Sequence, residues 1–160
     1  MAEAIRLLGS TYITCGKTSP NKSLLFQSFF EPILQDKTIE CSAIDLMSEE
    51  GLRQIAIELS GDNLWPVDIK STGNFEQLAL RELKLASRMD CLASKRALAA
   101  KTLRAGQNVK KTELRELLRQ MRDIGTAFKK LWLARNKASR LNDNMRLFNL
   151  AEDELKKRLR

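Results

Sequence analysis

Apolar residues recur at three- and four-residue steps in two adjoining stretches near the end of the chain. Residues at these steps lie on one face of an α-helix, so each stretch predicts an amphipathic helix. The first stripe contains Leu114, Leu117, Leu118, Met121, Ile124, Phe128, Leu131 and Trp132, and the second contains Leu141, Met145, Phe148, Ala151, Leu155 and Leu159.

The residues between the two stripes predict a tight turn. Asn136 is suited to end the first helix in a left-handed conformation, and Ser139 is suited to cap the second helix. Because only two or three residues remain for the connection, we expect the helices to lie antiparallel with their stripes in contact.

A longer helix is predicted upstream, over residues 75–104. Its inner stripe includes several alanines, which would let a neighbouring helix approach closely. Gly106 and Asn108 should end this helix, and Thr112 should cap the next one. The expected stripe contains Leu78, Leu83, Ala86, Met89, Ala93, Ala97 and Ala100.

The N-terminal part of the chain predicts shorter helices over residues 2–15, 22–31 and 48–59. Pro32 limits the second helix, and Ser48 is expected to cap the third. Residues 33–47 show no regular pattern. The side chains expected to face inward are Ile5, Leu8 and Tyr12 in the first helix, Phe26, Phe29 and Phe30 in the second, and Leu52, Ile55 and Leu59 in the third.

No stretch alternates as a β-strand does, and no repeat of 20–50 residues occurs. We therefore expect one all-α domain over residues 1–160. Residues 1–66 supply short helices and loops, and residues 67–160 supply three long helices in an antiparallel bundle on which the short helices pack. A continuous coiled coil is a weaker alternative, because Gly106 and Asn136 divide the apolar pattern.

Composition indicates the cellular compartment and excludes some classes of catalytic site. The 160 residues are 43% hydrophobic, yet no apolar run is long enough to span a bilayer, and Glu3 and Arg6 interrupt any signal peptide. The three widely spaced cysteines predict reduced thiols in a cytoplasmic protein. The absence of histidine excludes Ser-His-Asp and Cys-His sites within the chain, and we expect no metal or cofactor.

Charge is divided unevenly along the chain. Residues 1–80 hold 6 basic and 11 acidic residues, whereas residues 81–160 hold 22 basic and 9 acidic residues. A basic half of this kind suits a nucleic acid or an acidic protein surface. A solvated face crossed by ion pairs is the favoured interpretation, because Glu116 and Asp123 interrupt the basic ladder of Arg115, Arg119, Arg122, Lys129 and Lys130.

One segment resembles a known family. It reads Leu-Trp-x-x-Arg-Asn-x-x-Ser-Arg-Leu over residues 131–141, and with Phe148 it resembles the C-terminal helical region of glycoside hydrolase family 20 β-N-acetylhexosaminidases. The segment Pro20-Asn21-Lys22-Ser23-Leu24-Leu25-Phe26 is similar to one that follows the catalytic barrel in such enzymes. The resemblance is clearest in residues 128–150 and faint between residues 35 and 70.

The resemblance implies an accessory domain that packs against a catalytic barrel outside this chain. Such enzymes use an adjacent Asp-Glu pair at the end of a barrel strand, where the glutamic acid protonates the leaving oxygen. Here the pair Asp153-Glu154 falls on a predicted helix, where neighbouring positions point about 100° apart, and we expect it to be exposed and not catalytic. Gly16-Lys17-Thr18 predicts a turn after a helix, because Thr11 stands where a phosphate-binding loop needs glycine.

Four residues near the predicted turn are candidates for an interdomain contact: Trp132, Arg135, Asn136 and Arg140. Trp132 also fits the helical core, and Arg135 and Asn136 also fit roles in the cap and turn. The sequence thus leaves two hypotheses. The first is a non-catalytic domain of a β-N-acetylhexosaminidase, whose uncovered apolar surface would also permit a homodimer. The alternative is a basic helical bundle that binds nucleic acid or an acidic protein.

Overall fold

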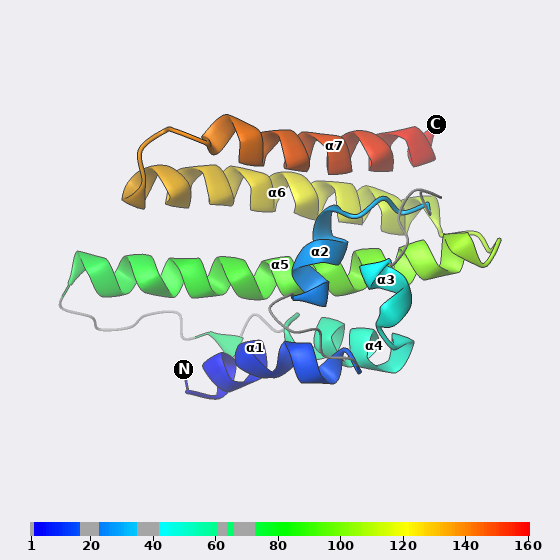
Figure 1. Ribbon diagram of the computed structural model, residues 1–160, viewed down its shortest axis with the longest axis horizontal. Helices are drawn as coiled ribbons and strands as arrows, with labels where there is room; N and C mark the ends of the chain where they lie inside the picture. The colour runs from blue at the N-terminus through cyan, green and yellow to red at the C-terminus, as the bar shows by residue number, and fades with distance from the viewer. Residues whose placement is uncertain (1, 17–22, 35–41, 61–63, 66–72) are drawn as a thin grey trace.

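The computed structural model describes residues 2–16, 23–34, 42–60, 64–65 and 73–160, and within them it contains helices and no strand (Figure 1). The predicted all-α class is therefore confirmed. The helices are α1 (Ala2–Thr14), α2 (Leu24–Phe30), α3 (Ala43–Leu46), α4 (Glu49–Glu58), α5 (Asn74–Arg104), α6 (Lys111–Arg135) and α7 (Leu141–Leu159).

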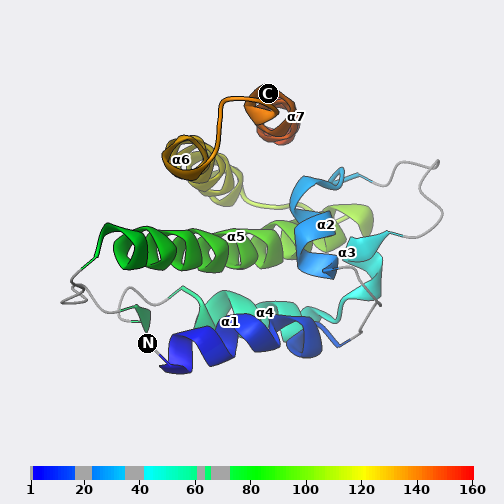
Figure 2. The same cartoon turned by 60° about the vertical axis from the view of Figure 1, so that its left-hand side comes forward.

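Helix α5 forms the centre of the molecule and contacts α1, α2, α3, α4 and α6. Helices α1 and α4 cover one side of it, and the α6–α7 pair lies on the other side (Figures 1 and 2). Helices α5, α6 and α7 run in alternating directions, as the colours of Figure 1 show. Helix α7 packs on α6 and α2, so the short α2 occupies a place beside the three long helices.

The alanines of α5 lie where its neighbours come closest. Ala93, Ala97, Ala99 and Ala100 are at most 1% exposed. Small side chains let the backbones of packed helices approach, which allows the middle and end of α5 to be enclosed from several sides. The beginning of the predicted stripe is less covered, since Leu78, Leu83, Ala86 and Met89 are only half-buried.

Glycine is required where α4 meets the end of α1. A Cβ atom added to Gly51 would lie 1.8 Å from the carbonyl oxygen of Thr14. The backbone N–H of Ser48 donates to the carbonyl of Cys15 at 2.9 Å, and the Ser48 hydroxyl accepts from the N–H of Gly51 at 3.1 Å. The predicted cap at Ser48 is confirmed, and it also anchors α4 against α1.

Aromatic rings join α2 to the α6–α7 pair. The ring centroid of Phe148 in α7 lies 5.8 Å from Phe29, 5.2 Å from Phe30 and 5.4 Å from Phe128. Phe29 and Phe148 are almost fully buried, whereas Phe26 is 60% exposed. The expectation that all three phenylalanines of α2 are buried is therefore wrong for Phe26, because the ring at the beginning of α2 lies at an open hollow beside Ala86 and Met89 that no described element covers.

Several predicted helix caps differ from those in the structure. Asn136 ends α6 as its C-cap, as predicted, but its backbone is extended, with φ −118° and ψ 159°, and Arg140 adopts the left-handed conformation instead, with φ 65°. Ser139 is not the N-cap of α7, because Arg140 takes that position without a side-chain bond. Thr112 lies inside α6, whose N-cap is Lys110. At this turn, Asn136 and Arg140 take the cap positions because α6 continues to Arg135 before the chain reverses.

Two N-terminal expectations also need correction. Ile5 and Tyr12 are 45% and 51% exposed, because α1 turns Ala4, Thr11 and Cys15 toward α4 and α5 instead. Residues 33–47 include a helix, α3, whose N-cap Ser42 accepts from the N–H of Asp45. In the Gly16-Lys17-Thr18 motif, Gly16 ends the α1 segment with φ 86°, and the other two residues lie outside the described residues.

Candidate functional site

The turn between α6 and α7 closes on the side chain of Trp132. The indole Nε1–H donates to the carbonyl of Lys137 at 3.1 Å, and the Trp132 carbonyl accepts from the backbone N–H of Asn136 at 2.7 Å. The Asn136 side-chain amide donates to the same carbonyl at 3.3 Å. Trp132 therefore stabilises the turn through these hydrogen bonds. It is half-buried, so it lies only partly in the core that the apolar stripe predicts for it.

Arg135 holds the end of α6 to the beginning of α5. Its Nε lies 2.9 Å from Oε1 of Glu82, and its guanidinium carbon lies 5.0 Å from the centroid of the Phe75 ring. The Arg135 side chain is 38% exposed. Of the two predicted contact arginines, Arg135 therefore has partners within the chain. In the part of the chain that the structure describes, Arg140 pairs only with Asp143, at 3.4 Å, on the open surface.

An apolar groove runs beside this turn, between the first half of α5 and the last part of α6. It has a volume of about 190 Å³, and a second hollow of about 120 Å³ continues it past Ala86 and Met89 toward α2. Its walls include Trp132 and Asn136, two of the four predicted contact residues. Apolar side chains form much of the remaining wall, among them Leu85, Met89, Phe128 and, at the α2 end, Phe26.

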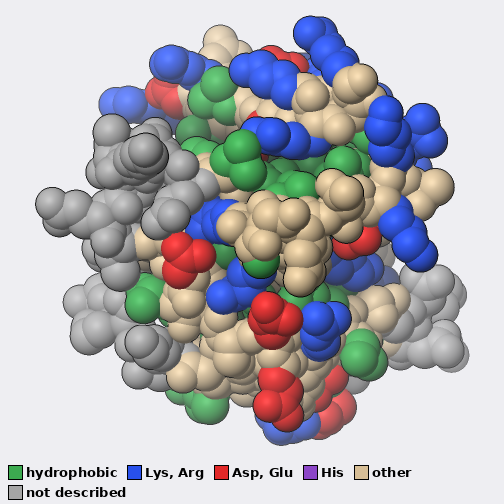
Figure 3. All heavy atoms as spheres, turned by 90° about the vertical axis from the view of Figure 1, so that its right-hand side faces the viewer, with side chains coloured by type: hydrophobic (Ala, Val, Ile, Leu, Met, Phe, Trp, Pro, Cys, Tyr) green, Lys and Arg blue, Asp and Glu red, His purple; other side chains and the backbone are tan. Residues whose placement is uncertain are grey.

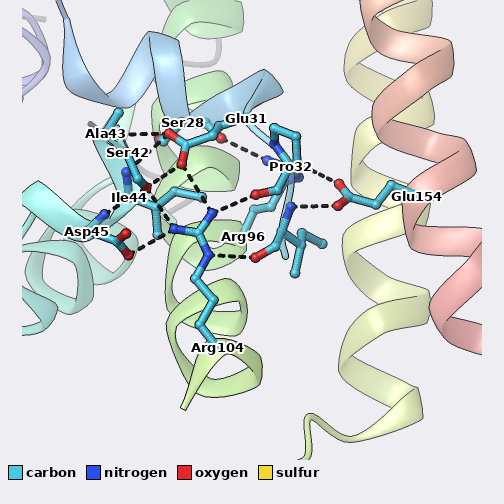
Figure 4. A network of polar contacts seen from close by, with 11 residues as sticks. Ser28, Glu31, Pro32, Ser42, Ala43, Ile44, Asp45, Arg96, Arg104 and Glu154 are labelled. Carbon is cyan, nitrogen blue, oxygen red and sulfur yellow. Dashed lines mark hydrogen bonds and ion pairs between the residues drawn. The ribbon is translucent and has the colours of Figure 1, made fainter. Parts of the chain in front are cut away.

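The opposite end of α5 holds a network of polar contacts centred on Arg104 (Figure 4). Its Nε donates to the carbonyl of Ile33 at 2.8 Å. One terminal nitrogen donates to Ser42 and Asp45, at 2.7 and 2.9 Å. The other donates to Glu31 and to the carbonyl of Pro32, at 3.1 and 2.7 Å. All five N–H donors of this guanidinium are used, which fixes the segments that flank α3 against α5.

Glu31 completes the network from the acceptor side. Its carboxylate accepts from the backbone N–H of Ala43 at 2.8 Å, from the N–H of Ile44 at 3.3 Å and from the hydroxyl of Ser42. The side chains of Glu31 and Arg104 are 8% and 11% exposed. A buried pair with further hydrogen bonds on both partners holds a specific geometry.

A second arginine of α5, Arg96, is fully buried and lies about two helical turns before Arg104. Its terminal nitrogens donate to the carbonyl of Ser28 at 2.8 Å and to Oε2 of Glu154 at 2.7 Å, while Nε has no partner among the described residues. Burial lowers the pKa of Arg96, and the charge and hydrogen bond of Glu154 act against that shift. The other oxygen of Glu154 accepts from the N–H of Ile33 at 2.6 Å. Arg96 therefore connects α5, α2 and α7.

The adjacent carboxylates Asp153 and Glu154 do different things. Asp153 is exposed, and its hydrogen bond to Lys156 at 2.9 Å lowers its pKa. Glu154 is not exposed as predicted, since its side chain is only 20% exposed and binds Arg96. The two side chains diverge as helix geometry requires. The pairing of Glu154 with Arg96 could be predicted only by knowing that α7 and α5 come together beside α2.

Asp90 is a half-buried carboxyl of α5, which the sequence patterns did not single out. Burial raises its pKa to about 6, although the Thr11 hydroxyl donates to it at 3.0 Å. The neighbouring thiol of Cys15 donates to the carbonyl of Thr11 at 2.9 Å. Burial first, and then the charge of Asp90, raise the pKa of Cys15 to about 11. At neutral pH this thiol is therefore protonated and a poor nucleophile.

The basic ladder of α6 is partly neutralised. Arg119 binds Glu116 at 2.6 Å and Asp123 at 2.7 Å, and Arg122 binds Glu152 at 3.1 Å. The hydrogen bonds from Arg119 and Gln120 lower the pKa of Glu116 to about 2. Figure 3 shows Lys and Arg crowding the part of this face where α6 and α7 lie, with acidic side chains more frequent toward α1 and α4.

Within the described residues, no group of three or more Cys, Asp or Glu side chains is placed to hold a metal ion. None of the helices described there combines the length and hydrophobicity needed to cross a membrane. Comparisons of the chain with models of protein families, with curated proteins and with solved structures found no match. The likeness to family 20 enzymes therefore rests on the quoted residues and stays a prediction.

Proposed function

We propose that this chain is a non-catalytic helical domain that packs against a catalytic barrel, as the C-terminal helical region of a family 20 β-N-acetylhexosaminidase would. The observation that carries the proposal is the position of the family-like segment. Its Trp132 and Asn136 line an open apolar groove beside an exposed turn. A groove of this composition favours a partner that buries apolar surface.

The proposed contact combines apolar and polar groups. Phe26 and Leu133 are 60% and 47% exposed near the two ends of α2 and α6 that border the groove. Arg140 stands on the turn with a solvent-exposed guanidinium. Buried apolar anchors with a surrounding polar rim are typical of domain and protein interfaces. Arg135 would then act indirectly, by holding α6 to α5 through Glu82.

The proposal is tested by mixing the chain with a purified family 20 barrel from which the C-terminal helical region has been deleted. We expect a complex by size-exclusion chromatography and a higher melting temperature for the barrel. Phe26→Lys should weaken the complex strongly. Ile57→Lys is the matched control, because Ile57 is 72% exposed on α4 and outside the groove.

Absence of a complex at micromolar concentrations, or equal loss with Phe26→Lys and Ile57→Lys, would contradict the proposal. The isolated chain should also fail to hydrolyse a chromogenic N-acetylglucosaminide. Turnover that disappears with Glu154→Gln, while the variant remains folded, would make this chain the enzyme instead.

The second candidate function is binding of nucleic acid or an acidic protein by the basic face. It is favoured by Arg115, Lys129 and Lys130, exposed residues of α6 that make no ion pair or hydrogen bond with the described residues. This function predicts binding of a short DNA duplex that weakens steeply with added salt. Fluorescence anisotropy at low salt checks it, and no binding there would remove it.

A further inference from the structure

A third and larger hollow lies apart from the apolar groove and its continuation. It is on the side of α5 where the end of α4 and the first half of α6 converge. Its volume is about 480 Å³, within the range of small-molecule sites. None of its wall residues belongs to the groove. The wall residues that matter for its chemistry are Trp65, Lys84, Arg88, Lys95, Arg119 and Asp123.

Basic side chains dominate the charge of this cleft. Lys84, Arg88 and Lys95 are spaced by four and seven residues on α5, so they share one helical face. Arg119 enters from α6, and it already binds Asp123 and Glu116. The acidic residue of the cleft is therefore neutralised from within the chain.

Two of these cations have no close partner. Arg88 is exposed and Lys95 is half-buried, and neither makes an ion pair or hydrogen bond with the described residues. Lys95 acts on Glu116 only at longer range, as a minor contribution to the lowered pKa of that carboxyl. Two cations on one helical face of the cleft, both unpaired within the described residues, suit an anion that carries two charges.

Trp65 adds an independent observation. The residue is 8% exposed and lines the cleft, and its indole Nε1–H is buried with no hydrogen-bond partner among the described residues. Buried donors in proteins are nearly always satisfied, so this N–H calls for an acceptor beyond the described residues, and a ligand oxygen at this wall of the cleft would be one. The indole ring also offers an apolar surface beside the cations.

We propose that this basic cleft binds a small phosphate-bearing molecule. The phosphate would lie between Arg88 and Lys95, since guanidinium and ammonium groups together bind phosphate oxygens well. An acceptor of the ligand would reach the Trp65 side of the cleft. A long polyanion is disfavoured, because the hollow is bounded by α4 and α6 and because Asp123 and Glu116 flank it.

The proposal is independent of a contact with a barrel, so either idea can fail without the other. The chain has two tryptophans, and Trp132→Phe leaves Trp65 as the single fluorescent reporter. Titration of this variant with pyrophosphate at constant ionic strength should give a saturable change in fluorescence. Calorimetry on the unmodified chain should give the same dissociation constant within experimental error.

Paired variants decide whether the cleft is the site. Arg88→Gln with Lys95→Gln should weaken pyrophosphate binding by roughly tenfold or more. Lys129→Gln with Lys130→Gln removes the same charge from the exposed face of α6 and should leave binding unchanged. Equal weakening by both pairs, no saturable signal at millimolar pyrophosphate, or binding of a DNA duplex without binding of pyrophosphate would each overturn the proposal.

Discussion

The two ends of α5 are built from the same kind of helix, but their surroundings differ. From Cys91 to Ala100 nearly every residue is buried, and Arg96 and Arg104 fasten α2, α3 and α7 to this half. From Asn74 to Met89 most residues are half-buried or exposed, and an apolar groove remains open beside Met89 and Phe128. The half from Cys91 to Ala100 is therefore enclosed by its own chain, whereas the half from Asn74 to Met89 keeps an open groove.

The comparison shows how side-chain size and polar chemistry act together. Alanines in the closed half permit close packing, which buries the arginines and requires that they find carboxylates and carbonyls. In the open half, leucine, methionine and phenylalanine side chains line a groove between the helices, and Arg135 joins α6 to α5 through its exposed contacts with Glu82 and Phe75. Stability should therefore be concentrated in the closed half of α5.

The largest predicted effect is the loss of the Arg104 network. Arg104→Met leaves the carboxylate of Glu31 buried without its cation, and we expect it to lower the free energy of unfolding by about 3–5 kcal/mol. Urea denaturation followed by circular dichroism measures this. Arg53→Met removes an exposed pair with Glu49 and should cost no more than about 0.5 kcal/mol. Similar losses for both variants would contradict the comparison.

A second experiment compares two apolar residues one helical turn apart on α5. Leu92 is 0% exposed, so Leu92→Ala should cost about 3 kcal/mol through lost burial and the cavity left behind. Met89 lines the open groove and is half-buried, so Met89→Ala should cost about 1 kcal/mol. If Met89→Ala were as costly in the isolated chain, the groove would be closed in solution.

Asp90 predicts a pH dependence at the border between the two halves. Its pKa rises from 3.8 to about 6 on burial, so the native state holds more protons than the unfolded state between these values. The contribution of Asp90 to stability is thus favourable at low pH and is lost as the pH rises through about 6. Asp90→Asn should remove this loss and raise stability at pH 7 by roughly 2 kcal/mol, somewhat below the full value of the shift because the site is not fully dry.

The measurement is thermal unfolding of both proteins across the acidic to neutral range. The advantage of Asp90→Asn should grow as the pH rises and vanish near the pKa of an unfolded aspartate. Other carboxyls, such as Glu116, titrate equally in both proteins and cancel in the difference. An advantage that is constant with pH would show that Asp90 is not buried as described.

The smallest effects separate the adjacent carboxylates of α7. Glu154→Gln removes the charge opposite Arg96 but keeps an oxygen that can accept from it, so it should cost less than Arg104→Met, about 1.5 kcal/mol, and lower the melting temperature measurably. Asp153→Asn should leave the melting temperature close to that of the unmodified chain, since its ion pair is exposed. Differential scanning calorimetry distinguishes them, and equal behaviour of the pair would remove Arg96 from the closed half's supports.

Local patterns in the sequence were enough to predict the class and most of the helices. The three- and four-residue repeats give α5, α6 and α7, and Ser48 marks the start of α4, because periodicity and capping depend on residues within one or two turns. The spacing of Lys84, Arg88 and Lys95 also places them on one helical face, but among the 22 basic residues of positions 81–160 this spacing alone does not indicate a cleft. The family-like segment includes Trp132 and Asn136, but it does not predict that both line one groove with residues of α5.

By itself, the sequence determined that this chain forms amphipathic helices with one basic and one acidic half. Only the tertiary structure decided that Phe26 faces outward, that Arg140 and not Asn136 is left-handed, and that Glu154 is paired with Arg96. A repeat specifies which face of a helix avoids water, but it does not specify which other helix covers that face. Arg96 and Glu154 lie 58 residues apart, and their contact exists only because α2, α5 and α7 meet at one place.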